Sequence, residues 1–152
     1  MSTYHEIEII GWVGGKPEMR YTSDGTPVTN FSVAASRKYT DASGKQQKRT
    51  WWFNVTAWRR QAETCNEYLD KGMQVFVKGR LGGDRLEKQD GSTQIVPHTW
   101  TGKDGQPAAK FDVTAQVVHF LGRAGGGASA IGLPDTSLEP PPEGEGEAEI
   151  PF

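Results

Sequence analysis

With 152 residues, 24% of them charged, and a formal net charge of −2, the chain can bury one sizeable core, and a second domain is not expected. It contains no apolar run near the roughly 18 residues of a membrane span and no basic, apolar leader, so neither a membrane protein nor an exported one is indicated. Its single cysteine excludes a disulfide framework within one chain and a cysteine-based zinc site, and it fits a reducing compartment such as the cytoplasm.

Two strands are expected before residue 40, with a turn between them. Residues 6–13 begin with alternating apolar and acidic side chains and predict a strand that breaks at Gly11 and Gly14. An Asp-Gly pair at positions 24 and 25 is a strong signal for a hairpin turn. Residues 27–38 then alternate again and predict the second strand.

A third strand is expected over residues 50–60, because this stretch is rich in aromatic and β-branched residues. Alternation turns one apolar set toward the core and leaves Trp52 and Trp58 on the other, polar side, about 20 Å apart along an extended strand. Cations flank that side, and flat rings beside cations suit the stacked bases and phosphates of a single nucleic-acid strand. The alternative is that another sheet or a subunit covers the two indoles.

One helix is expected, over residues 61–71, with Gly72 as its C-terminal cap. Residues 73–81 and 110–121 predict further strands, and the polar stretch between them contains two Asp-Gly turn signals, which indicate a flexible pair of hairpins. The residues expected in the core or on the apolar face of the helix are Phe31, Val33, Trp51, Phe53, Val55, Ala57, Ala62, Cys65, Tyr68, Leu69, Val75, Val77, Phe111, Val113, Val117 and Phe120.

Three strands, one helix and then two or more strands are typical of a small closed barrel with a helix inserted after the third strand. We therefore predict an all-β fold with one helix, the five-stranded oligonucleotide/oligosaccharide-binding (OB) barrel, over residues 1–121. A β-sandwich is the competing all-β fold.

Residues 122–152 differ in composition from the rest of the chain. They contain one cation against six anions, which leaves 16 cations against 13 anions in residues 1–121. A stretch of Gly, Pro and acidic residues has little to bury and predicts a disordered tail. Its apolar end is either a chain end without a role or a peptide that docks in a basic, apolar pocket of another protein. The residues of this docking tip are Glu147, Glu149, Ile150, Pro151 and Phe152.

Several motifs resemble those of the bacterial single-stranded DNA-binding proteins, over nearly the whole chain. They are the opening stretches Ile10–Gly14 and Pro17–Tyr21, the strand Gly25–Ser32, the helix end Glu67–Gly72 and the strand Val75–Leu81. The acidic tail that closes on Ile-Pro-Phe also resembles the peptide with which this family docks replication and repair proteins. The resemblance implies an OB fold that binds single-stranded DNA and assembles as a homotetramer.

The resemblance also implies which residues contact DNA. Trp52 and Trp58 take the positions of base-stacking aromatics, Tyr39 stands in place of a tryptophan, and Trp100 is similar to the tryptophan in the loop before the last strand. Trp12 replaces a basic residue and is either an extra stacking platform or a packing residue. The candidate phosphate contacts are Arg20, Arg37, Lys38, Lys48, Arg49, Arg59, Lys78 and Arg80.

Two further departures from the family pattern concern its assembly and its loops. Phe53 stands in place of a polar histidine, which alters the expected subunit interface. About fifteen extra residues lie between Leu81 and Trp100, so an insertion there lengthens the DNA-binding loop or adds contacts between subunits.

The leading prediction is sequence-independent binding and protection of single-stranded DNA in replication, recombination and repair, with recruitment of partner proteins through the tail. The alternative is an OB-fold adaptor that docks proteins and binds DNA only secondarily. An enzyme is not expected, because His5, a loop residue His98 and a solvent-facing His119 are scattered and no metal-ligand or phosphate-loop spacing occurs. We therefore expect no cofactor, no metal and no membrane, and a cytoplasmic, nucleoid-associated location.

Overall fold

The computed structural model describes residues 2–123, which form nine strands and one helix. In chain order these are β1 (Ile7–Val13), β2 (Glu18–Tyr21), β3 (Pro27–Thr40), β4 (Gln46–Trp58), α1 (Arg60–Tyr68), β5 (Met73–Gly82), β6 (Asp84–Glu87), β7 (Thr93–Val96), β8 (His98–Thr101) and β9 (Pro107–Arg123). Within this part of the chain no helix has the length and hydropathy needed to cross a membrane. Residues 124–152, with the whole docking tip, lie outside the described residues.

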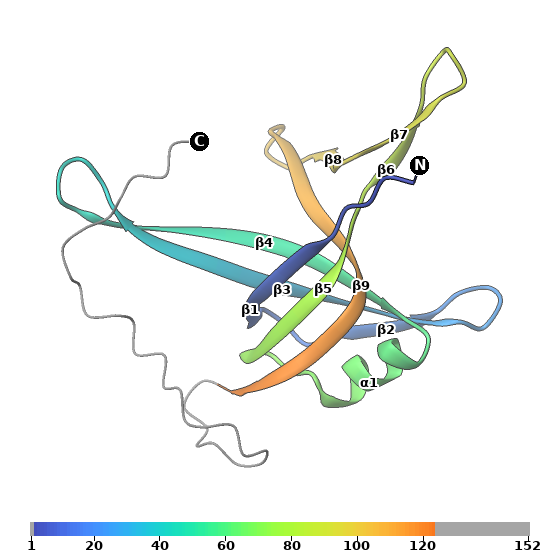
Figure 1. Cartoon of the computed structure of the whole chain (residues 1–152), viewed down its shortest axis with the longest axis horizontal. Helices are drawn as coiled ribbons and strands as arrows, with labels where there is room; N and C mark the ends of the chain where they lie inside the picture. The colour runs from blue at the N-terminus through green and yellow to red at the C-terminus, as the bar shows by residue number, and fades with distance from the viewer. Residues whose placement is uncertain (1, 124–152) are drawn as a thin grey trace.

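Five strands form a closed barrel in the order β1-β5-β9-β4-β3 (Figure 1). The barrel closes where β1 meets β3, with Trp12 opposite Ala34 and Val13 opposite Val33. Strand β9 runs parallel to β4, and the other barrel pairs are antiparallel. This confirms the all-β fold with one helix and the OB barrel rather than a sandwich.

The core consists mainly of small β-branched side chains. Val33, Val55, Val75, Val77 and Val113 are all buried, as the alternation along their strands predicts. Each fully buried valine contributes about 1.5–3 kcal/mol of hydrophobic stabilisation. The barrel is therefore narrow, and its interior is filled by the side chains of its own strands.

Helix α1 covers one end of the barrel and contacts β2, β3 and β4 (Figure 1). Ala62 and Cys65 are buried under it, and the hydroxyl of Thr29 donates to the Ala62 carbonyl at 2.7 Å. The helix is shorter than predicted, because Leu69 already has extended backbone, and Gly72 lies in the following turn rather than at the cap. Tyr68, expected on the apolar face, is exposed. It is the last residue of the helix, and its ring lies beside Phe120 of β9, with centroids 6.4 Å apart, rather than in the core.

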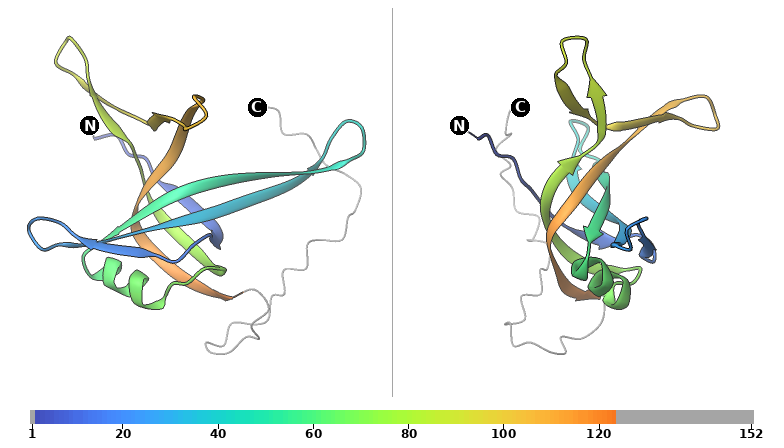
Figure 2. Two further views of the ribbon diagram at one scale, coloured as in Figure 1. Left: turned by 180° about the vertical axis from the view of Figure 1, so that it is seen from behind. Right: turned by 90° about the vertical axis from the view of Figure 1, so that its right-hand side faces the viewer.

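Strands β3 and β4 extend well beyond the barrel as a two-stranded hairpin (Figure 1). Pairing between β4 and β9 ends at Phe53 and Phe111, and we call residues 35–51 beyond that point the arm. The predicted pair of hairpins is also present, as β6–β7 and as β8 with the start of β9. Figure 2 shows that the arm and these two hairpins project from the barrel in different directions.

Two residues that were predicted to lie in the core are exposed at the end of the barrel. Trp51 is 40% exposed and Phe111 is 49% exposed, although both follow the same alternation as buried neighbours. They lie at or beyond the last paired residues of β4 and β9, so no strand covers them. Phe53, on the last rung, is partly buried and packs against Phe111 with ring centroids 5.7 Å apart.

A register shift in β9 shows that a third predicted core residue, Val117, is not in the core. Lys78 pairs with Val117 but Gly79 pairs with Ala115, so the register against β5 skips Gln116 and the alternation of β9 reverses. Val118 and Phe120 therefore pack against the core, whereas Val117, which the unbroken pattern predicts to be buried there, does not.

Strand β1 runs through Gly11 without breaking, so the strand break predicted at Gly11 is wrong. A Cβ at this position would lie 2.5 Å from the Ala34 carbonyl oxygen and 2.6 Å from Val33 Cγ1. The missing side chain is thus what allows β1 to approach β3 and close the barrel, and it does not mark the end of a strand.

Candidate nucleic-acid interface

Two exposed indoles flank the seam that closes the barrel. Trp12 on β1 lies opposite Ala34 on β3, and Ala34 in turn lies opposite Trp52 on β4. Residues directly opposite one another in antiparallel pairs share a face, so the two indoles are on one side with only a methyl group between them. Trp12 is 40% exposed and Trp52 is 55% exposed. We call this side of β3 and β4 the outer face.

Gly14 sets the position of the Trp52 ring. A Cβ on Gly14 would lie 2.5 Å from Cζ3 of Trp52 and 2.9 Å from Oγ of Ser32. The Gly14 amide donates to the Ser32 carbonyl at 3.0 Å, which fixes the chain beneath the ring. The benzo edge of the indole therefore packs against Gly14, while more than half of the side chain remains exposed.

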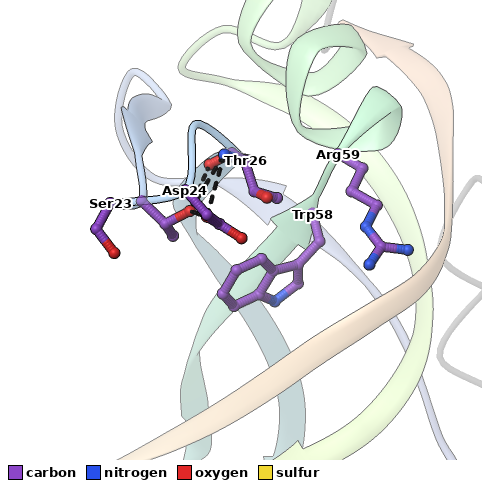
Figure 3. A pocket seen from close by; sticks show the side chains of 6 residues that line it. Ser23, Asp24, Thr26, Trp58 and Arg59 are labelled. Carbon is purple, nitrogen blue, oxygen red and sulfur yellow. Dashed lines mark hydrogen bonds between the residues drawn. The ribbon is translucent and has the colours of Figure 1, made fainter.

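Trp58 lies at the far end of β4 on the same outer face, as alternation predicts. With Arg59 it lines an open hollow of about 540 Å³ whose other wall is the turn after β2 (Figure 3). The Thr22 hydroxyl donates to Asp24 and is the main cause that lowers the pKa of this carboxyl. The hollow thus combines an indole, a guanidinium and one ionised carboxylate.

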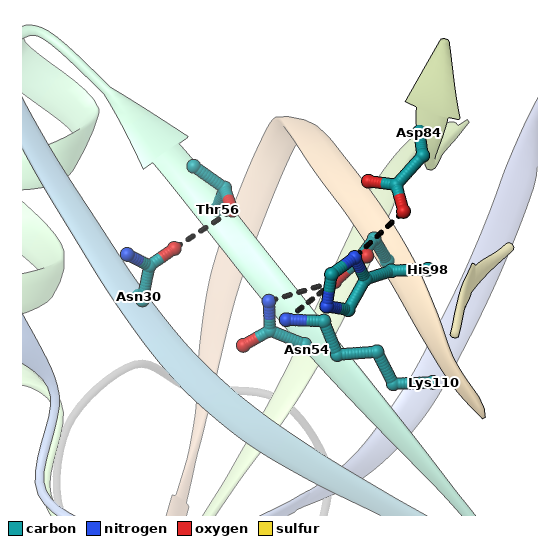
Figure 4. Close-up of polar contacts among 7 residues, drawn as sticks. Asn30, Asn54, Thr56, Asp84, His98 and Lys110 are labelled. Atoms are coloured by element: carbon teal, nitrogen blue, oxygen red, sulfur yellow. Dashed lines mark hydrogen bonds and ion pairs between the residues drawn. The ribbon is translucent and has the colours of Figure 1, made fainter. Parts of the chain in front are cut away.

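Between Trp52 and Trp58 the outer face is polar, and its groups bond to one another across three strands. Thr56 donates to Asn30 at 2.8 Å, and Asn54 donates to Asp112 at 2.8 Å (Figure 4). Lys110 lies 3.7 Å from the same Asp112 carboxylate. The polar surface expected between the two indoles is therefore present.

Trp100 extends this face toward β8. In register it lies opposite Ala108, and His98 lies opposite Lys110, two positions before Asp112 on β9. The Trp100 ring stacks on His98 with centroids 5.8 Å apart. His98 Nδ1 in turn lies 2.8 Å from Asp84 (Figure 4). His98 is thus a strand residue beside an exposed indole and not the predicted loop residue. The sequence contained a signal for this position, because His98 and Trp100 are two residues apart and therefore share a face if the segment is a strand.

Tyr39 is on the opposite side of the arm from Trp52. Tyr39 is paired with Gln47, and both occupy odd-numbered positions. Within the barrel the odd-numbered residues of these two strands face the core. The Arg49 guanidinium lies 4.7 Å from the centre of its ring. The structure therefore does not bring Tyr39 together with Trp12 and Trp52.

The eight candidate cations fall into two groups. Arg20 pairs with Glu18 at 3.3 Å, Lys78 pairs with Glu6 at 2.9 Å, and Arg80 lies 5.6 Å from the ring centre of Tyr4. The hydrogen bond that Lys78 donates to the Glu6 carboxylate raises the pKa of Lys78. Within residues 2–123 the remaining cations form no ion pair, and four of them are on the arm; the set is Arg37, Lys38, Lys48, Arg49 and Arg59.

Neither a reactive thiol nor a metal cluster occurs in the described part of the chain. Cys65 is fully buried, and burial raises the pKa of its thiol to about 11, so it remains a small apolar side chain as predicted. Residues 2–123 contain no group of three or more His, Cys, Asp or Glu that could hold a metal ion. His119, exposed on β9, stacks on Phe76 with centroids 5.8 Å apart.

The fold and the site together define an OB-barrel protein with exposed aromatic rings and unpaired cations on its barrel face and arm. The chain belongs to the single-strand binding protein family, whose model matches residues 4–121. This membership confirms the resemblance in the sequence motifs. It also places the chain in a family of binding proteins rather than enzymes.

Two curated relatives illustrate the similarity. The single-stranded DNA-binding protein 1 of Chlorobaculum tepidum is 43% identical over 77 residues, which are 51% of this chain and 48% of that protein. The single-stranded DNA-binding protein of Neisseria meningitidis serogroup A is 34% identical over 118 residues, which are 78% of this chain and 60% of that protein. The matched segments thus span only part of the length of these relatives.

Two solved structures have similar folds. The crystal structure of the wild-type single-stranded DNA-binding protein from Thermus aquaticus superposes with a TM-score of 0.54 at 28% identity, over 76% of this chain and 49% of that one. The Plasmodium falciparum SSB complex with ssDNA superposes with a TM-score of 0.59 at 21% identity, over 80% of this chain and 97% of that one. The second likeness concerns the fold alone.

Proposed function

We propose that this protein binds single-stranded DNA without reading its sequence. The observation that carries the proposal is the pair of exposed indoles, Trp12 and Trp52, on one face beside unpaired arm cations. Every base has a flat face, so stacking on an indole is tolerant of sequence and contributes about 1–3 kcal/mol per base. Trp58 and Trp100 continue the same face at its two ends, and the family membership supports the same ligand.

Trp12 fits better as a stacking platform than as a packing residue. Its neighbour across β3 is only an alanine, and it shares a face with Trp52. Of the two roles that the sequence left open, the exposed geometry favours the first.

Titration of the tryptophan fluorescence with oligothymidine, at low and at high salt, tests the proposal. We expect strong quenching by the single strand and weak quenching by duplex DNA of the same length. A folded Trp52→Ala, Trp58→Ala double variant should bind at least about ten-fold more weakly. Unchanged affinity in that variant would contradict the stacking assignment.

The salt dependence of binding tests the phosphate contacts. Each phosphate contact that is lost should reduce the slope of log affinity against log salt by about 0.7 for a single strand. We expect this reduction for Lys48→Gln on the arm. Lys71→Gln, in the turn after α1, is the matched control and should leave the slope unchanged.

We further propose that the barrel, residues 1–121, serves replication, recombination and repair, and that the tail recruits partner proteins through Glu147 to Phe152. The motivating observations are the acidic composition and apolar end of the tail. Deleting Glu149 to Phe152 should abolish pull-down of partner proteins while DNA affinity holds or rises. Loss of DNA binding on that deletion would contradict this division of labour between barrel and tail. Such a protein would act beside the chromosome, in the cytoplasm.

A homotetramer is the assembly that we propose. The outer side of the β1-β5-β9 sheet presents a cross-strand row in which Ile10 lies opposite Phe76 and Phe76 lies opposite His119, and Ile10 is exposed. A row of one aliphatic and two aromatic side chains is suited to contact with a second copy of the chain. Sedimentation velocity should give the mass of four chains, and Ile10→Lys should reduce it.

A further inference from the structure

The side of the arm opposite Trp52 is a second aromatic and cationic surface. Its residues are Arg37 and Tyr39 on β3 with Arg49 and Trp51 on β4, and we call it the second face. Within the barrel the side chains at odd-numbered positions of β3 and β4 point into the core. Pairing of β4 with β9 ends at Phe53, so in the described chain the barrel does not continue over this face of the arm. Trp51 is therefore 40% exposed, with only Ala35 opposite it.

Both faces of the arm place like charges directly opposite each other. Arg37 is paired in register with Arg49 on the second face, and Lys38 is paired with Lys48 on the outer face. Like charges at directly opposite positions of an antiparallel pair destabilise it. Within residues 2–123 none of these four cations forms an ion pair that would offset the repulsion. A polyanion along either face would relieve it.

The aromatic rings of the second face can stack on bases, and its cations can contact phosphates. The Arg49 guanidinium lies 4.7 Å from the centre of the Tyr39 ring, so a flat cation and a flat ring already stack there. Trp51 follows Arg49 by two positions on the same side of β4. Alternating planar groups and positive charges along a strand form a stacking track for a single nucleic-acid strand.

We propose that single-stranded DNA binds this second face as well as the outer face, with Trp51 as a base-stacking residue and Arg37 and Arg49 as phosphate contacts. The proposal rests on the single-stranded DNA binding proposed above and extends it to a residue that the alternation of β4 predicts to be buried. A second subunit suits the surface less well, because two arginines lie directly opposite each other here and burial of both charges is costly unless the partner supplies acidic groups for them.

Trp51 and Trp52 provide a matched pair for the test, since they are adjacent, have the same side chain and lie on opposite faces of one strand. The full chain is compared with Trp51→Ala and Trp52→Ala in titrations with long oligothymidine. Tyr68→Ala, an exposed aromatic on α1, is the control. We expect both tryptophan variants to bind at least about five-fold more weakly and the control to bind as the parent does.

Fluorescence adds a second measurement. Trp51→Phe keeps an aromatic ring for stacking but removes one indole. If the Trp51 indole stacks on bases, this variant should retain most of the affinity and show a smaller quenched signal on saturation with DNA. The mass of the assembly, measured by sedimentation velocity, should be the same for parent and variants.

Each other outcome contradicts the proposal in a distinct way. Weaker binding by Trp52→Ala alone would restrict DNA to the outer face and leave the proposed function intact. Weaker binding by Trp51→Ala together with a changed mass would assign Trp51 to a subunit interface. If neither variant binds more weakly, neither Trp51 nor Trp52 stacks on bases, and the second face is wrong. The proposed function itself would be contradicted only if the parent chain failed to bind oligothymidine.

Discussion

The orientation of the Trp52 indole depends on a residue that has no side chain. Gly14 follows β1, and its hydrogen atom leaves room for the ring that reaches over it from β4. The neighbours that an added methyl group would meet are side-chain atoms of Trp52 and Ser32, not backbone. The folded protein can therefore absorb the change, but only by moving the indole.

Gly14→Ala should for this reason impair binding more than folding. We expect affinity for oligothymidine to fall about five-fold or more, as for the loss of one stacked base, with little change in the urea midpoint. Fluorescence titration and urea unfolding measure the two effects. Gly15→Ala is the control, since a Cβ there would meet no atom within 4 Å. Equal affinities of the two variants would mean that the Trp52 ring does not contact bases.

The arm is the element on which both proposed binding surfaces depend, and its tip is organised by one carboxylate. Asp41 accepts from the Ser43 amide at 2.9 Å, the Lys45 amide at 3.0 Å and the Gln47 side chain at 3.0 Å. Its hydrogen bond from the Ser43 hydroxyl is the main cause that lowers the carboxyl pKa to about 2. The folded turn thus favours the ionised form.

The sign of this shift predicts the pH dependence of the arm. Because the folded pKa of Asp41 is depressed, its hydrogen bonds stabilise the arm tip fully above the unfolded pKa of 3.8. This stabilisation is lost as the pH falls through the folded pKa of about 2. Amide exchange at the arm tip, followed by NMR, should therefore be equally protected from pH 7 to about pH 4 and less protected toward pH 2. Protection that already declines between pH 7 and pH 5 would contradict this.

Removal of the carboxylate should have the same effect at neutral pH. In Asp41→Ala we expect faster amide exchange at the arm tip with an unchanged global unfolding midpoint, because the arm lies outside the barrel core. Asp90→Ala is the matched control. Asp90 accepts from the Ser92 amide at 2.9 Å in the β6–β7 turn, so its loss should affect only that hairpin.

At the scale of the whole molecule, the barrel depends on a seam of two residue pairs between β1 and β3. Gly11 precedes that seam, and a Cβ there would lie 2.5 Å from the Ala34 carbonyl oxygen. Backbone in a paired strand cannot swing aside, unlike the side chains next to Gly14. The barrel therefore tolerates no larger residue at this position without strain.

Gly11→Ala should lower the free energy of unfolding by about 1–3 kcal/mol, the usual cost of forcing extra volume into a packed interior. Urea unfolding followed by circular dichroism measures it. Gly82→Ala is the control, because a Cβ there would be in ordinary contact with Asp112 Cβ at 3.5 Å. An unchanged midpoint for Gly11→Ala would mean that the seam opens at little cost.

The sequence alone determined the features that depend on neighbours along the chain. Alternation located the strands and the buried valines, the Asp-Gly pairs located the turns, and the single helix in its slot after the third barrel strand indicated the OB barrel. It also determined that Trp52 and Trp58 share a polar face. These properties follow from local backbone geometry, in which successive side chains of a strand point to opposite sides.

Only the tertiary structure decided what covers each face. Trp51 and Phe111 follow the same pattern as buried neighbours but lie where β4 and β9 separate, and Val117 lies beyond a bulge that reverses the pattern. Tyr39 and Trp52, both candidate stacking residues, proved to lie on opposite sides of one hairpin. Alternation assigns residues to a face, whereas burial depends on where the partner strands end, and that is a property of the closed barrel as a whole.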